Sequence, residues 1–65
     1  MNYKPIKAVM LRNNDKFIDV DGVITVTNFK MNFLKYIVTF TATKEDGSVS
    51  QRWVDMDQLV NKVVG

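Results

Sequence analysis

Basic side chains and a single tryptophan are the residues of this sequence best suited to binding a ligand. The first 35 residues hold six basic and three acidic side chains, whereas the other 30 hold three basic and four acidic ones. Lysine and arginine neutralise phosphates, and tryptophan stacks on nucleic-acid bases. We therefore expect six residues to form a nucleic-acid site: Lys4, Lys7, Arg12, Lys16, Arg52 and Trp53.

A purely structural interpretation exists for the same residues. The basic side chains would then form an ordinary solvated surface, since the net charge of the chain is only +2. Trp53 would cover one end of a small core, where a large ring adds buried area. Both interpretations predict a folded domain, and they differ in whether Trp53 is buried.

Side chains suited to catalysis or metal binding are scarce. The chain contains no Cys and no His, so it has neither a thiolate nucleophile nor an imidazole base. Asp19 with Asp21, and Asp55 with Asp57, stand two residues apart, a spacing that does not match a calcium loop. We expect no catalytic residue, no metal and no cofactor, and hence no enzyme.

Composition favours one small β domain over residues 1–65. Val, Ile and Thr make up 19 of the 65 residues, and β-branched side chains suit pleated, half-buried strands. Without Cys there is no disulfide, so stability must come from packing. The sequence shows no signal peptide and no apolar run long enough to span a bilayer, and we expect a cytoplasmic protein without a membrane partner.

Alternating patterns and turn residues predict five antiparallel strands. A first strand over residues 4–12 ends at a turn at residues 13–15, and Asp21-Gly22 joins strands 17–20 and 23–27 in a hairpin. A break follows at residues 28–32. Strand 34–43 then leads through the turn at residues 44–47 to strand 48–54.

The two faces of strand 34–43 differ in character. We expect Leu34, Tyr36, Val38, Phe40 and Ala42 to face the core. Thr39, Thr41 and Thr43 face outward, and we expect Ser48, Ser50 and Arg52 opposite them. Ile24, Val26 and Ile37 lie on or beside this outer face, so the sheet closes into a barrel, pairs with a second copy or meets a partner there.

The C-terminal segment has a helical period. Met56, Leu59, Val60 and Val63 follow the i, i+3, i+4, i+7 spacing of an amphipathic helix. Asp55 can cap its first amides, with Gln58 three residues further on. We expect a short C-terminal α-helix that docks on the sheet, because a helix of about nine residues does not persist alone.

One segment resembles a known fold family. From Tyr36 to Leu59 the chain carries Tyr-x-Val-x-Phe, an Asp-Gly turn, Trp-Val, acidic residues and Leu. This pattern resembles SH3-like small β-barrels of the chromo and Tudor type, and the layout is similar to the small basic chromatin proteins of thermophilic archaea. The resemblance implies an SH3-like barrel or strongly bent sheet. This chain is less basic than those proteins, and Tyr36 and Phe40, expected in the core, leave no evident aromatic cage.

Two functions from different classes follow from these observations. The first is a non-catalytic binding module that takes nucleic acid on a basic sheet face. The alternative is a stand-alone accessory or inhibitor protein, of the kind found in phages and other mobile elements, that binds a host protein by pairing with a strand edge. A homodimer through the apolar outer positions is a third possibility.

Overall fold

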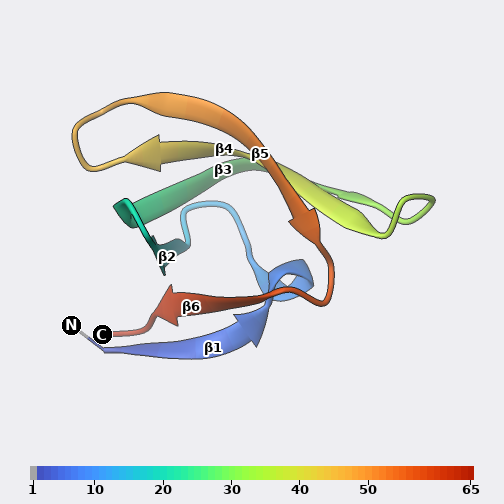
Figure 1. Cartoon of the computed structure of the whole chain (residues 1–65), viewed down its shortest axis with the longest axis horizontal. Helices are drawn as coiled ribbons and strands as arrows, with labels where there is room; N and C mark the ends of the chain where they lie inside the picture. The colour runs from blue at the N-terminus through green and yellow to red at the C-terminus, as the bar shows by residue number, and fades with distance from the viewer. Residues whose placement is uncertain (1) are drawn as a thin grey trace.

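The fold is one antiparallel sheet with a single short helical turn. The computed structural model describes residues 2–65 (Figure 1). Its elements are β1 (Tyr3–Lys7), the 3₁₀ turn η1 (Ala8–Met10), β2 (Lys16–Asp19), β3 (Gly22–Asn32), β4 (Ile37–Lys44), β5 (Val49–Asp55) and β6 (Leu59–Val63). The mainly β class predicted from the composition is confirmed, with six strands in place of five.

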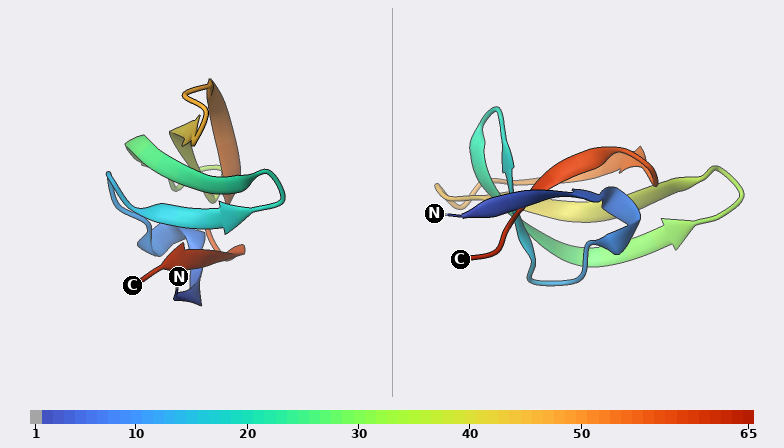
Figure 2. Two further views of the ribbon diagram at one scale, coloured as in Figure 1. Left: turned by 90° about the vertical axis from the view of Figure 1, so that its left-hand side faces the viewer. Right: turned by 90° about the horizontal axis from the view of Figure 1, so that it is seen from below.

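The sheet is open and curls around its core. Its strand order is β1-β6-β2-β3-β4-β5, with every neighbouring pair antiparallel. Figures 1 and 2 show β3, β4 and β5 on one side of the molecule and β1 with β6 on the other. Across residues 2–65, β1 and β5 form two edges that are not hydrogen-bonded to each other. The sheet is thus open, and the closed-barrel alternative is not formed.

The core lies inside this curl. Nine apolar side chains are buried there: Ala8, Leu11, Phe17, Ile24, Val26, Val38, Phe40, Ala42 and Met56. The Phe17 and Phe40 rings meet edge to face, with centroids 5.8 Å apart and an interplanar angle of 88°. Burial of one Val, Leu, Ile, Phe or Met side chain stabilises the fold by about 2 kcal/mol. Core packing therefore provides the stability that disulfides provide in many small domains.

Two predicted turns form hairpins. Asp19 pairs with Gly22, so the loop between β2 and β3 is Val20-Asp21, one residue earlier than predicted. Gly22 has a φ of 105° and Gly47 a φ of 90°. These angles are accessible to glycine at little steric cost, which explains why both Asp-Gly pairs mark chain reversals.

The predicted break at residues 28–32 is instead a β-bulge within β3. The β3–β4 register shifts between Thr27 and Lys30, and Asn28 has a φ of 53°. Asparagine tolerates this left-handed conformation better than most residues. Because pairing resumes beyond the bulge, the β3–β4 hairpin continues past the rest of the sheet, as the right-hand view of Figure 2 shows.

The first strand is shorter than the predicted range of residues 4–12. After β1 the chain turns through η1, whose amides reach the loop between β5 and β6: the Ala8 amide donates to the Gln58 carbonyl (2.8 Å) and the Val9 amide to the Met56 carbonyl (3.1 Å). Ala8 and Leu11 are fully buried. This segment therefore closes one end of the core, the place expected for a C-terminal helix.

The predicted C-terminal helix is wrong. Leu59–Val63 forms β6, which pairs along its whole length with β1 and at two positions with β2. Of the expected apolar stripe, Met56 is buried whereas Leu59 is exposed. As a strand, Leu59–Val63 pairs with β1 at every residue and also with β2 at Asn61 and Lys62. A short helix has too few internal hydrogen bonds to compete.

Candidate functional site

The outward face of β3, β4 and β5 carries a row of threonines from β4. In its register Thr39 faces Trp53, Thr41 faces Gln51 and Thr43 faces Val49. The predicted partners Ser48, Ser50 and Arg52 are therefore wrong by one position. A shift of one residue moves a strand's side chains to the opposite face, and here it brings Trp53 outward.

Trp53 is 65% exposed on this outer face. Together with Lys35, Ile37, Thr39 and Asp55 it lines a shallow, open pocket. The interpretation in which Trp53 covers the core is wrong, because η1 and Leu11 occupy that place. An exposed indole ring on the outside of the sheet presents its surface to a planar ligand group.

Thr41 lies in the middle of the outer face and is hydrogen-bonded to two neighbouring side chains. The Thr41 hydroxyl oxygen accepts hydrogen bonds from the side-chain amides of Gln51 (Nε2, 2.9 Å) and Asn28 (Nδ2, 3.3 Å). Thr41 is itself buried among these neighbours. The bulge at Asn28 therefore contributes to the surface as well as to the path of β3, and the side chains here are held in place before any ligand binds.

Three lysines lie on or beside the outer face. Lys16 of β2 is the cross-strand partner of Thr25, and Lys30 of β3 is the partner of Thr39, which lies next to Trp53 of β5. Lys35 lines the same pocket as Trp53. Within residues 2–65 none of these three lysines forms an ion pair, so their charges are available to an anionic ligand.

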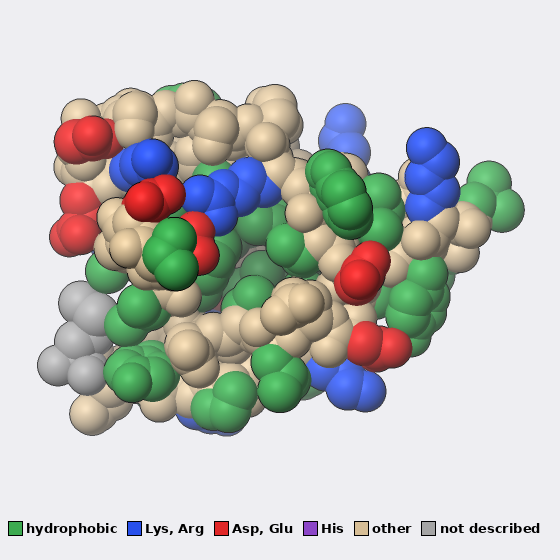
Figure 3. Space-filling model, viewed as in Figure 1, with side chains coloured by type: hydrophobic (Ala, Val, Ile, Leu, Met, Phe, Trp, Pro, Cys, Tyr) green, Lys and Arg blue, Asp and Glu red, His purple; other side chains and the backbone are tan. Residues whose placement is uncertain are grey.

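Arg52 points to the other side of the sheet from Trp53. It forms an ion pair with Asp19 and a longer one, 4.0 Å, with Asp21. The hydrogen bond that Arg52 donates lowers the pKa of Asp19 below its ordinary value, against the opposing effect of burial. Figure 3 shows basic and acidic side chains interleaved in this part of the molecule. Arg52 is thus a structural residue and lies outside the outer face.

The other predicted site residues are dispersed. Lys4 and Lys7 lie on the edge strand β1, and Lys7 is 3.6 Å from Asp57. The Arg12 guanidinium donates to the carbonyls of Val9 (3.1 Å) and Leu11 (2.7 Å), which fixes the loop after η1. Of the six residues predicted for one site, only Lys16 and Trp53 share the outer face.

The predicted site omitted Lys30, Lys35 and Ile37, and Thr39 was expected on the outer face but not among the site residues. A signal for them was present, because the chain from Gly22 to Lys44 contains three lysines and no carboxylate. The hairpin β3–β4 is built from this acid-free stretch. Charge counted over one hairpin would have located the site better than charge counted over half of the chain.

Other kinds of site find no support in the part of the chain that the structure describes. No group of three or more carboxylates is arranged to hold a metal ion. No helix there is long and apolar enough to cross a membrane. Comparisons of the chain with protein-family models, with curated proteins and with solved structures find no match.

Proposed function

We propose that the chain is a non-catalytic binding module that takes single-stranded nucleic acid on the outer face of β3, β4 and β5. The exposed Trp53 ring, on a polar sheet beside lysines without ion pairs, is the observation that carries this proposal. Stacking of one base on an aromatic ring contributes about 1–3 kcal/mol. Unpaired bases are required, because a duplex keeps its base faces stacked and hidden.

Charge sets the strength of the proposed binding. Lys16, Lys30 and Lys35 suit backbone phosphates, whereas Asp55 beside Trp53 repels them. With about three phosphates neutralised, log affinity falls with log salt at a slope of roughly −2. The module is thus expected to bind weakly and with a modest salt dependence.

Quenching of Trp53 fluorescence by short DNA and RNA oligonucleotides tests this proposal. Because Trp53 is the only tryptophan, its emission reports on the face directly. We expect quenching by single strands and little by duplexes. A Trp53→Ala variant, followed by NMR titration, should bind roughly 5- to 150-fold more weakly, in line with the loss of one stacked base.

Val49→Ala is the matched control, because Val49 is an exposed apolar residue on the same face of β5. It should change the affinity far less than Trp53→Ala does, because a small aliphatic side chain does not stack on a base. Equal effects of both substitutions would reject base stacking on Trp53, and no NMR shifts on the outer face at low salt would reject nucleic-acid binding there.

The open edge of β5 supports a second candidate function, binding of a protein strand. The other edge, β1, is blunted by Pro5 in its middle and by Lys4 and Lys7, features that disfavour added strands. β5 has seven residues and no proline. A stand-alone accessory protein could pair there with a partner by β-augmentation.

Pull-down with nuclease present distinguishes the two functions. A protein partner would be retained after nuclease treatment, and its NMR footprint would follow the β5 backbone. The nucleic-acid proposal instead predicts that nuclease removes everything bound.

A further inference from the structure

The tip of the β3–β4 hairpin is the most exposed apolar part of the molecule that the outer face does not include. Leu34 is 100% exposed and Phe33 is 72% exposed. Met31 and Tyr36 beside them are about half exposed. Exposed large apolar side chains grouped on one projection mark an interaction site more strongly than single ones do.

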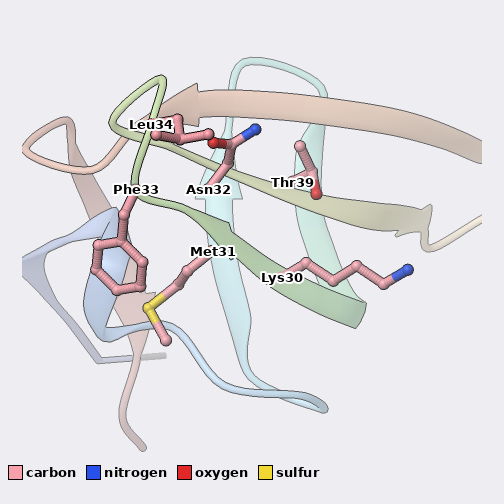
Figure 4. Close-up of a pocket in the computed structure, with 6 residues that line it drawn as sticks. All are labelled: Lys30, Met31, Asn32, Phe33, Leu34 and Thr39. Carbon is pink, nitrogen blue, oxygen red and sulfur yellow. The ribbon is translucent and has the colours of Figure 1, made fainter.

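Apolar groups project from both sides of this tip. Figure 4 shows Met31 and Phe33 on one side of the ribbon and Leu34 on the other. A flat protein surface would cover only one of these sides. A fluid apolar medium, by contrast, surrounds a convex projection on all sides.

The positive charges beside the tip favour binding to an anionic surface. Lys30 and Lys35 flank the apolar residues, and no carboxylate occurs from Gly22 to Lys44. Two carboxylates lie at the base of the tip: Asp57 accepts a hydrogen bond from the Tyr36 hydroxyl at 3.3 Å, and Asp55 pairs with Ile37 and lines a pocket with Lys35. Lysines beside inserted apolar groups favour anionic headgroups.

The tip is also held in shape before binding. The Lys35 amide donates to the Asn32 side-chain oxygen at 3.1 Å, and the Met56 amide donates to the Tyr36 carbonyl at 3.1 Å. These bonds tie the turn to itself and to the loop that follows β5. The backbone of the tip therefore loses little conformational entropy when the tip binds to another surface.

We propose that this tip inserts into the interface of an anionic lipid bilayer. Phe33 and Leu34 enter the boundary between headgroups and acyl chains, and Lys30 and Lys35 contact the lipid phosphates. The attachment is peripheral and reversible, because only one small turn is inserted. This departs from the sequence-based expectation of no membrane partner, which rested on the absence of a spanning segment.

Sedimentation of the full chain with vesicles tests the insertion. We expect binding to vesicles that mix phosphatidylcholine with phosphatidylglycerol, and little binding to phosphatidylcholine alone. A Phe33→Ser/Leu34→Ser variant should partition at least tenfold less, since it removes the inserted apolar surface. A Lys30→Gln/Lys35→Gln variant should lose roughly 25-fold, at about fivefold per lysine.

Val20→Ser is the matched control, because Val20 is 96% exposed in another hairpin loop, between Asp19 and Asp21. Its vesicle binding should equal that of the unmodified chain. The Phe33→Ser/Leu34→Ser variant should keep its oligonucleotide binding, so this proposal and the proposed function fail separately. Circular dichroism would verify that each variant is folded.

Three results would overturn the proposal. The first is no sedimentation with anionic vesicles at millimolar lipid. The second is equal partitioning of the tip variant and the Val20→Ser control. The third is a mass that depends on concentration in the unmodified chain but not in the tip variant, which would assign the tip to a second copy of this chain.

Discussion

At the scale of single residues, neighbours in sequence have opposite roles. Arg52 and Trp53 are consecutive in β5, yet Arg52 bonds to Asp19 while Trp53 is exposed on the outer face. Strand geometry alternates successive side chains between the two faces. A basic residue beside an aromatic one in sequence is therefore poor evidence that both contact the same ligand.

The pair of Arg52 and Asp19 predicts a specific loss of stability in acid. Because the pKa of Asp19 is lowered in the folded state, its contribution is fully present above the ordinary aspartate pKa and is lost as pH falls through the folded-state pKa. Arg52→Gln should raise the Asp19 pKa toward its ordinary value and cost about 1.5 kcal/mol of unfolding free energy near neutral pH. Carboxyl NMR titration and urea unfolding measure the two effects.

Asp46 is the internal control for this titration. Its pKa is also lowered, by the hydrogen bond from the Ser48 hydroxyl, and Arg52 plays no part there. If Arg52→Gln shifts the Asp46 pKa as much as the Asp19 pKa, the effect is global and the assignment to the ion pair is wrong.

At the scale of elements, hairpins were the best predicted part of the fold. Gly22 and Gly47 mark chain reversals in both sequence and structure, since the positive φ angle of each is a local preference of glycine. Tyr36, with a φ of 57°, reverses the chain without glycine, so its turn was predicted as part of a strand. Leu34 and Tyr36, expected in the core, are exposed for this reason.

Gly47→Ala tests the local encoding of the β4–β5 hairpin. A Cβ at this position would meet no other atom within 4 Å, so the substitution changes backbone strain and not packing. We expect a loss of about 1 kcal/mol in unfolding free energy, seen as a lower urea midpoint with an unchanged m-value. An unchanged midpoint would contradict the strain argument.

At the scale of the whole molecule, β6 joins the two ends of the chain. It lies between β1 and β2, and the Val64 amide donates to the Asn2 carbonyl at 2.9 Å. β1 pairs with β6 and with no other strand of the described chain. Stability therefore depends on contacts between residues that are nearly the whole chain apart.

Removal of residues 59–65 should abolish cooperative folding. The truncation leaves β1 without its neighbour and exposes Phe17 at the edge of β2. We expect loss of near-ultraviolet circular dichroism and of the sigmoidal thermal transition. Removal of Gly65 alone should change little, and a truncated chain that keeps its transition would contradict this role of β6.

The amino-acid sequence alone established the β class, the presence of a hairpin at each of the two Asp-Gly pairs and the alternation of Val38, Phe40 and Ala42. Each depends on a few consecutive residues, through backbone φ preferences or the two-residue period of a strand. Only the tertiary structure decided that residues 59–63 form a strand, that Trp53 faces outward and that the sheet stays open. These outcomes depend on register and on partners distant in the chain, and a local pattern does not contain that information.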